Sequence, residues 1–133
     1  SVEPEKAQRP VNVDVTTEET YDPSGLWQKG SYALRKLYYD SDKPLLVVYT
    51  SPSCGPCHVL KPQLQRVIRE FDGSAQAVVI DIEADQAIAE QAGVSGTPTV
   101  QLFQQKSMLK QWRGVKERRE FKAAIEDCLK TKV

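Results

Sequence analysis

An apolar run that stops just before a pair of cysteines is the feature that most constrains this chain. Residues 45–49 read Leu-Leu-Val-Val-Tyr, which is typical of a strand buried on both faces of a parallel sheet. Pro52 has no backbone N–H to donate to a sheet, so the strand must end before it. The next apolar residues recur at helical spacing, at positions 60, 64, 67, 68 and 71. Cys54 and Cys57 therefore stand where a buried strand passes into a helix.

The start of a helix favours a reactive thiolate. Its unpaired N–H groups and the positive end of its dipole stabilise a negative sulfur, and comparable Cys-x-x-Cys sites have a pKa of about 7. The two-residue spacer puts Cys57 one helical turn beyond Cys54, close enough for a disulfide. Pro56 suits an early helical position, and Gly55 would let the backbone bend beside the sulfurs. The pattern predicts a redox-active dithiol with Cys54 as the nucleophile and Cys57 as the resolving thiol.

Zinc binding is the alternative, because half of a zinc site has the same spacing. A structural zinc site uses four protein ligands, whereas this chain has three cysteines and one histidine. We therefore predict no metal site. Cys128 falls on the apolar stripe of the last predicted helix, which predicts a buried, inert thiol rather than a regulatory one. His58 is expected on the solvated first turn of its helix, with an electrostatic effect on Cys57 as the alternative.

The composition argues against several function classes. The chain carries 18 basic and 18 acidic residues, so no net charge attracts nucleic acid or an anionic membrane. We expect no membrane-spanning segment and no signal peptide. Three cysteines are too few for a secreted disulfide framework, which favours a reducing compartment. The first residue, Ser1, is not methionine, which suggests a piece of a longer protein.

Helical and extended patterns alternate after residue 24. We expect helices at 31–40, 57–71, 85–92 and 116–130, and strands at 45–50, 77–82, 99–103 and 108–113. Pro62 should kink the second helix. Asp85 should cap the third helix, and Gly93 should end it. This order predicts an α/β fold, a central mixed β-sheet flanked by helices on both faces.

Residues 1–22 differ in composition from the rest of the chain. They are polar and acidic and contain Pro4 and Pro10, which predicts a flexible linker or extension ahead of a domain at 23–133. Val11, Val13 and Val15 alternate with polar residues, so a short edge strand is the alternative.

Together these features resemble the thioredoxin family. The matches are Cys54-Gly55-Pro56-Cys57, Pro62, Gly96-Thr97-Pro98-Thr99 and Gly114, in the family's order and spacing over residues 45–129. The resemblance implies a thioredoxin fold, with a cis peptide bond before Pro98 and that proline packed against the disulfide. It also implies that Thr97 presents its backbone to an extended client segment. The implied client-binding residues are Gly55, Pro56, Thr97, Pro98 and Gly114.

Three positions depart from the usual thioredoxin pattern. Ser53 precedes the first cysteine, where most thioredoxins have tryptophan. Val48 and Val79 replace a buried aspartate and a lysine that help to move the proton of the second cysteine. Both charges are absent together, so no buried charge is left alone. Proton transfer at Cys57 would then use water, a group of the partner or His58.

A narrower resemblance concerns residues 30–38, 49–54 and 80–85 and the pair Met108-Leu109. They are similar to the thioredoxin domain at the carboxyl end of the C-type NADPH-thioredoxin reductases of cyanobacteria and chloroplasts. This implies that the domain itself has no cofactor and takes electrons from a reductase domain with FAD and NADPH on the same polypeptide. The implied clients are 2-Cys peroxiredoxin and other disulfide-containing proteins. Residues 1–22 would be the interdomain linker. The protein would be located in the cytoplasm or, in a plant, in the chloroplast stroma.

Two other function classes stay open: a free-standing general thioredoxin, and a docking module whose thiols play no part. The Gly55-Pro56 spacer matches reducing thioredoxins, with a potential of about −270 mV, rather than disulfide isomerases near about −180 mV. A docking module would bind its partners equally well with serine at both cysteines. The sequence therefore favours a monomeric protein-disulfide reductase.

Overall fold

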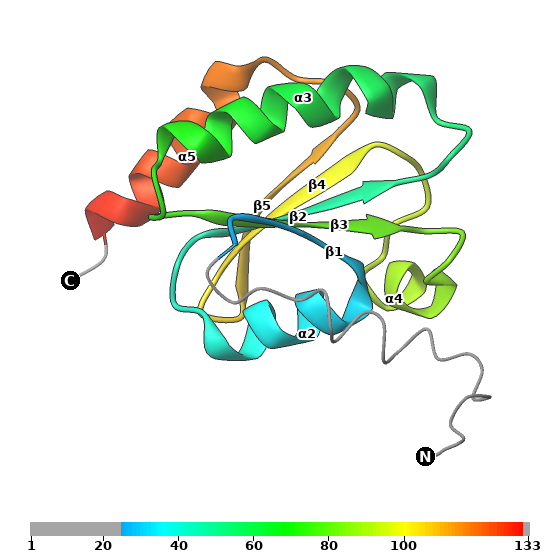
Figure 1. The fold of residues 1–133 in the computed structure, drawn as a ribbon, viewed down its shortest axis with the longest axis horizontal. Helices are drawn as coiled ribbons and strands as arrows, with labels where there is room; N and C mark the ends of the chain where they lie inside the picture. The colour runs from blue at the N-terminus through cyan, green and yellow to red at the C-terminus, as the bar shows by residue number, and fades with distance from the viewer. Residues whose placement is uncertain (1–24, 132–133) are drawn as a thin grey trace, which may run out of the picture.

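The structure, a computed structural model, describes residues 25–131. Within this range five strands form one mixed sheet in the order β1-β3-β2-β4-β5. The strands are β1 (Trp27–Lys29), β2 (Leu45–Thr50), β3 (Gln76–Asp81), β4 (Thr99–Gln104) and β5 (Ser107–Arg113). The helices are α2 (Gly30–Asp40), α3 (Gly55–Glu70), α4 (Gln86–Gln91) and α5 (Arg118–Thr131). In Figure 1, α3 and α5 cover one face of the sheet and α2 and α4 the other, which confirms the predicted α/β architecture.

Strand β2 is buried over its whole length because both of its faces are covered. It pairs in parallel with β3 and antiparallel with β4. The register carries one row of side chains across the sheet, in the order Val79, Val48, Val100, Trp112. This row belongs to the core cluster that the buried sides of α3 and α5 complete.

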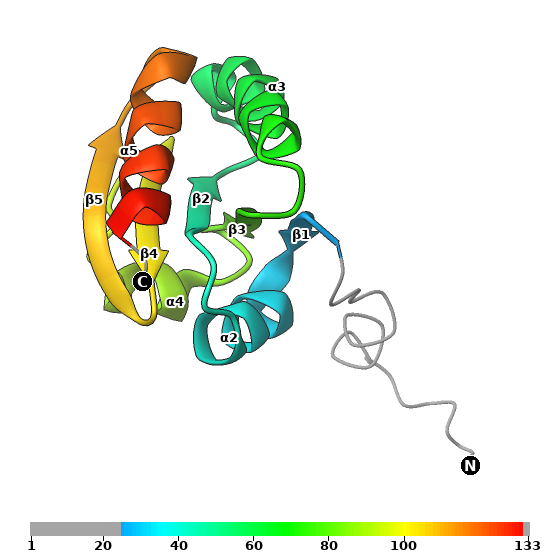
Figure 2. The same cartoon turned by 90° about the vertical axis from the view of Figure 1, so that its left-hand side faces the viewer.

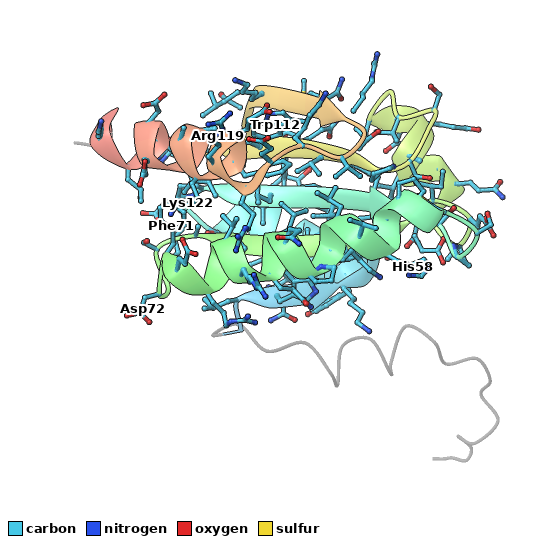
Figure 3. The ribbon with its side chains drawn as sticks, turned by 90° about the horizontal axis from the view of Figure 1, so that it is seen from above. His58, Phe71, Asp72, Trp112, Arg119 and Lys122 are labelled. Carbon is cyan, nitrogen blue, oxygen red and sulfur yellow. A yellow bond between two sulfur atoms is a disulfide. The ribbon has the colours of Figure 1, made fainter. Side chains whose placement is uncertain are left out.

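The sheet has two different edges, which Figure 2 shows with β5 at one side and β1 at the other. Strand β5 is joined to β4 by a tight turn at Gln105 and Lys106, which both have a positive φ. Helices α3 and α5 lie side by side above the sheet (Figure 3), and an exposed ion pair at 2.9 Å joins Glu70 to Lys122. The last two predicted strands and the predicted final helix are therefore present.

Strand β1 is the element that the sequence does not predict. Its three residues are too few to show an alternating pattern, and it forms by pairing in parallel with residues 77–79 of β3. The other elements are present with shifted ends. Helix α3 begins at Gly55 instead of Cys57 and runs through Pro62 without ending there. Helix α5 begins at Arg118 instead of Lys116.

Asp85 occupies the predicted N-cap position of α4, but the predicted capping by its side chain is wrong. Asp85 stands directly before α4, but its side chain makes no capping hydrogen bond. Asp81 holds the turn that precedes the helix, because its Oδ1 accepts from the backbone N–H groups of Glu83 at 2.9 Å and Ala84 at 3.4 Å. Burial, reinforced by the negative charge of Asp81, raises the pKa of the Asp85 carboxyl. Gly93 has a φ of 74° just after the helix, as expected of a glycine that ends it.

The predictions for the first residues of the chain cannot be compared with the structure. The linker at residues 1–22 and its alternative, a strand at 11–15, lie outside the described residues. In the part that is described, no helix combines the length and the apolar character that crossing a membrane requires.

Candidate redox site

The two motif cysteines lie at the start of α3, Cys54 directly before the helix and Cys57 in its first turn. Cys54 is the N-cap residue, and Pro56 takes one of the first two helical positions, as the sequence predicts. A disulfide joins Cys54 to Cys57, with the two Cα atoms 5.4 Å apart. Strand β2 ends at Thr50, at the same end of the sheet (Figure 1). The predicted passage from buried strand to helix is therefore confirmed.

Gly55 does not have the role that the sequence suggested. It lies inside α3, and its φ is not positive. A Cβ atom added there would meet no other atom within 4 Å. Neither a backbone bend nor a close contact therefore requires the glycine. Gly55 and Pro56 are both exposed and lie between two buried cysteines.

The two sulfur-bearing residues differ in exposure and in hydrogen bonding. Cys54 is 8% exposed, whereas Cys57 is 1% exposed. The backbone N–H of Cys57 donates to Sγ of Cys54 at 3.2 Å. A thiolate on Cys54 would gain from this N–H and from the helix dipole at the start of α3. The geometry supports attack by Cys54, with Cys57 held behind it.

The loop before β4 carries the second set of predicted site residues. The peptide bond between Thr97 and Pro98 is cis, as the family resemblance implied. Thr99 pairs with Tyr49, so this loop and the start of α3 lie at the same end of the sheet. Pro98 is buried and its carbonyl accepts from the N–H of Gly114 at 2.9 Å. Gly114 has a φ of 83°, a conformation that residues with a side chain rarely adopt.

Exposed apolar side chains flank this end of the molecule. His58 lies at the start of α3 (Figure 3) and is exposed, which confirms its predicted place on the solvated first turn. Val59 follows it with 57% of its surface exposed, and Val115, next to Gly114, is 45% exposed. Sequence reasoning missed both valines. The signal for Val59 was its place off the apolar stripe of the helix.

Apolar contact takes the place of the family's charged pair. Val48 and Val79 are directly paired across β2 and β3 and are 0% and 9% exposed. Among the side chains that the structure describes, no carboxylate is buried. Trp112, at the end of the same row, is buried against Phe121 with the ring centroids 4.7 Å apart. Trp112 is therefore a core residue, and Trp27 packs partly buried against the same cluster.

No cluster of metal-ligating side chains accompanies the cysteines. Within the described range, no group of three or more His, Cys, Asp or Glu residues is arranged to hold a metal ion. Cys54 and Cys57 are bonded to each other, and His58 is exposed. The geometry at this helix start is that of a dithiol–disulfide pair.

Cys128 lies apart from this site. It is 3% exposed on the face of α5 that also buries Phe121 and Ile125, which confirms the predicted core position. Burial raises the pKa of the Cys128 thiol, and the nearby charge of Asp127 raises it further. A buried thiol with a raised pKa is a poor nucleophile at neutral pH.

Thiol labelling of the oxidised protein tests this description of Cys128. With Cys54 and Cys57 closed in a disulfide, we expect iodoacetamide to modify Cys128 about 100-fold or more slowly in the native chain than in urea, because access requires local unfolding. Cys128→Ala should lower the free energy of unfolding by about 1 kcal/mol, as for a lost methyl-sized group, and leave disulfide reduction unchanged. Rapid labelling of the native protein would contradict burial.

Comparison with known proteins agrees with this geometry. The family model described as Thioredoxin matches residues 31–127. The chain is 50% identical over 109 residues to NADPH-dependent thioredoxin reductase 3 of Arabidopsis thaliana, which covers 82% of this chain and 21% of that protein. It is 34% identical over 96 residues to a chloroplastic Y-type thioredoxin of the same plant, which covers 72% of this chain and 56% of that protein. The chain thus spans about a fifth of the first relative and about half of the second.

Two solved structures have the same fold. A mutant thioredoxin from Halobacterium salinarum superposes with a TM-score of 0.70 at 28% identity, covering 86% of this chain and 97% of that chain. Chloroplastic thioredoxin z superposes with a TM-score of 0.72 at 20% identity, covering 83% of this chain and 99% of that chain. At its lower identity, the second likeness bears on the fold alone. The predicted thioredoxin fold is confirmed.

Proposed function

Because this chain belongs to the thioredoxin family of protein-disulfide reductases, we propose that its Cys54–Cys57 dithiol accepts electrons from an NADPH- and FAD-dependent reductase domain of the same polypeptide. The dithiol then reduces client disulfides, that of 2-Cys peroxiredoxin among them. The observation that carries the redox function is the disulfide at the start of α3, in which Cys54 is the more exposed partner. The 50% identity to the plant reductase supports the electron donor.

In the proposed cycle, the Cys54 thiolate attacks one sulfur of the client disulfide. The client's S–S bond breaks, and its other sulfur leaves as a thiolate and takes up a proton. Cys57 then loses its proton and attacks Sγ of Cys54, which releases the second client sulfur and closes the Cys54–Cys57 disulfide. Two electrons have passed to the client, and two from the reductase domain reopen the bond. With Val48 and Val79 in the core, water, a partner's group or His58 takes the proton of Cys57.

Client docking in this proposal uses the surface around the disulfide. Thr97 is half-buried, and its backbone would pair with an extended client segment. Gly55, Pro56, Pro98 and Gly114 shape the same surface, and the exposed Val59 and Val115 add apolar area for contact. Such a surface is selective for unfolded or extended segments that carry a disulfide.

The acidic tract at residues 1–22 supports a tethered arrangement in the same proposal. A polar linker holds two domains of one polypeptide at an effective concentration in the range of about 1 mM. A thioredoxin domain held so close to its donor needs only weak affinity for it. We propose that the isolated chain is a monomer with no nucleic-acid or membrane partner. We also propose that the protein is located in the cytoplasm or, for a plant, in the chloroplast stroma. A chloroplastic relative supports the second location.

Stopped-flow reduction of the Cys54–Cys57 disulfide tests the tethered donor. The chain is mixed at about 1 μM with NADPH and a separate C-type reductase domain, and the same two domains are compared when joined through residues 1–22. We expect the fusion to be reduced up to about 1000-fold faster, the ratio of the effective to the free concentration. A fusion carrying Cys54→Ser, which cannot form the disulfide, is the control for flavin turnover without transfer.

Two outcomes would contradict this proposal. If a free-standing thioredoxin reductase serves the isolated chain as fast as the fusion is reduced, the protein is an ordinary general thioredoxin with an acidic extension. If clients bind equally well when both Cys54 and Cys57 are changed to serine, and wild type reduces none of them, it is a docking module.

A further inference from the structure

A buried glutamine stands in the middle of the sheet, on the face that α2 and α4 cover. Gln101 is 1% exposed in β4, between the apolar residues Val100 and Leu102. Burying a carboxamide costs free energy unless its polar atoms form hydrogen bonds. An apolar side chain would fill this position at no such cost. A polar group here therefore needs a structural or functional reason.

The side chain of Gln101 joins three separate elements. Its Nε2 donates to the carbonyl of Ala92 at 3.2 Å and to Oε1 of Gln111 on β5 at 2.7 Å. Its Oε1 accepts from the hydroxyl of Tyr49 on β2 at 3.2 Å. A backbone carbonyl can only accept, so the amide nitrogen must face Ala92 and the oxygen must face Tyr49. Burial raises the pKa of Tyr49 to about 12, so its hydroxyl keeps its proton at neutral pH.

Ala92 is the point at which the client-binding loop begins. It follows the last residue of α4, and the chain then runs through Gly93, which has a positive φ, to the cis bond at Pro98. The far end of this loop is held by two hydrogen bonds, from the Thr99 hydroxyl to Gly96 and from the Gly114 N–H to Pro98. Gln101 holds the near end to the sheet.

We propose that Gln101 is a positioning residue for client binding, because its amide fixes the start of the loop that presents Thr97 and Pro98. This inference rests on the proposed function, in which that loop binds the client. Gln101 and Tyr49 line a groove of about 530 Å³ that Cys54 and Cys57 do not line. Gln101 acts through the loop and not on the sulfurs. Loss of its amide therefore weakens client binding and leaves the intrinsic reactivity of Cys54 unchanged.

Two disulfides of different size separate these effects. Insulin, whose reduction is driven by dithiothreitol, is a protein disulfide that needs the loop. The small aromatic disulfide DTNB, added to the pre-reduced chain, needs only the Cys54 thiolate. We expect Gln101→Leu in the full chain to raise KM for insulin about 5- to 10-fold, the factor that corresponds to one ordinary hydrogen bond. Its kcat with insulin and its rate with DTNB should stay within about 2-fold of wild type.

Tyr49→Phe is the matched control. It removes a hydroxyl from the same buried network and lowers stability, but it leaves the bond between Gln101 and Ala92 in place. We expect its KM for insulin to equal that of wild type. If Gln101→Leu does not fold, Gln101→Met replaces it, because its unbranched side chain has a similar length but no N–H for Ala92.

The inference is overturned if the folded Gln101 variant has an unchanged KM for insulin. It is overturned equally if the Gln101 variant reduces DTNB and insulin with the same loss of rate. It is also overturned if Tyr49→Phe raises the KM for insulin in proportion to its own loss of thermal stability. Failure of the wild-type chain to reduce insulin would instead refute the proposed function. The two ideas therefore fail in different measurements.

Discussion

Cys57→Ser is expected to hold a client in a stable mixed disulfide through Cys54, whereas Cys54→Ser traps none. The more exposed Cys54 accepts an N–H bond at the start of α3 and is favoured as the attacking thiolate. Without the resolving thiol of Cys57, the intermediate has no internal route to release. Both variants should lose nearly all turnover, since each step of exchange needs its own sulfur.

Trapping is measured with insulin and with 2-Cys peroxiredoxin in their disulfide-bonded forms. The adducts are separated on non-reducing gels and identified by mass spectrometry of the intact proteins. A chain with serine at both positions is the control for adducts through Cys128. Adducts of equal yield from both single variants, or a higher yield from Cys54→Ser, would reverse the assignment of the two cysteines.

Val48→Asp should be the most destabilising of the single changes considered, and increasingly so at higher pH. Val48 is completely buried and directly paired with Val79, so the introduced carboxyl enters an apolar environment with no partner. In the protonated form it costs about 1–3 kcal/mol as an unsatisfied polar group. Burial also raises its pKa in the folded state, by up to about 3–5 units for a fully buried group.

The sign of the pH effect follows from this raised pKa. Below the unfolded value of about 3.9, both states hold the proton and only the neutral cost applies. As the pH rises toward the folded pKa, the unfolded state has already released its proton, so stability falls by about 1.4 kcal/mol per pH unit. Above the folded pKa the loss is constant. A shift of about 3 units removes about 4 kcal/mol more, a large share of the about 5–15 kcal/mol of a typical domain.

Urea unfolding of wild type and variant from pH 4.5 to 9 measures this trend. Val48→Asn is the matched control, because it has the same shape but cannot ionise and should show a cost that does not depend on pH. Adding Val79→Lys to Val48→Asp should recover part of the loss at high pH, since the register places the two side chains side by side. Equal stability of Val48→Asp and wild type from neutral to alkaline pH would contradict the buried position.

Local patterns were sufficient for the parts of the site that depend on neighbouring residues. The continuous apolar run of β2 and the helical spacing after it placed Cys54 and Cys57 correctly at a strand-to-helix passage. Pro56 in the first positions of the helix and Cys128 on the buried stripe of α5 follow from the same short-range periodicity. The reason is that a helix bonds within itself, so its own sequence shows where it begins and which face it buries.

Conformations that need a distant partner were not readable in this way. The residues alone would give a trans bond before Pro98, and only the resemblance to a family predicted the cis bond that the structure has. Gly55 was expected to allow a bend but lies inside a helix, and Asp85 takes the N-cap position of α4 without the expected side-chain bond. In each case the local sequence is compatible with more than one arrangement.

The sequence by itself thus determined the redox pair, the order of the main elements and the apolar replacement at Val48 and Val79. Only the tertiary structure decided the pairing of β1, the different exposure of the two cysteines and the bonds of Gln101. Strand β1 exists because β3 lies beside it, some 50 residues further along the chain. Gln101 is satisfied by Tyr49 from 52 residues away and by the end of α4. Hydrogen bonds of this kind depend on which distant segments fold together, and short-range periodicity in the sequence does not indicate this.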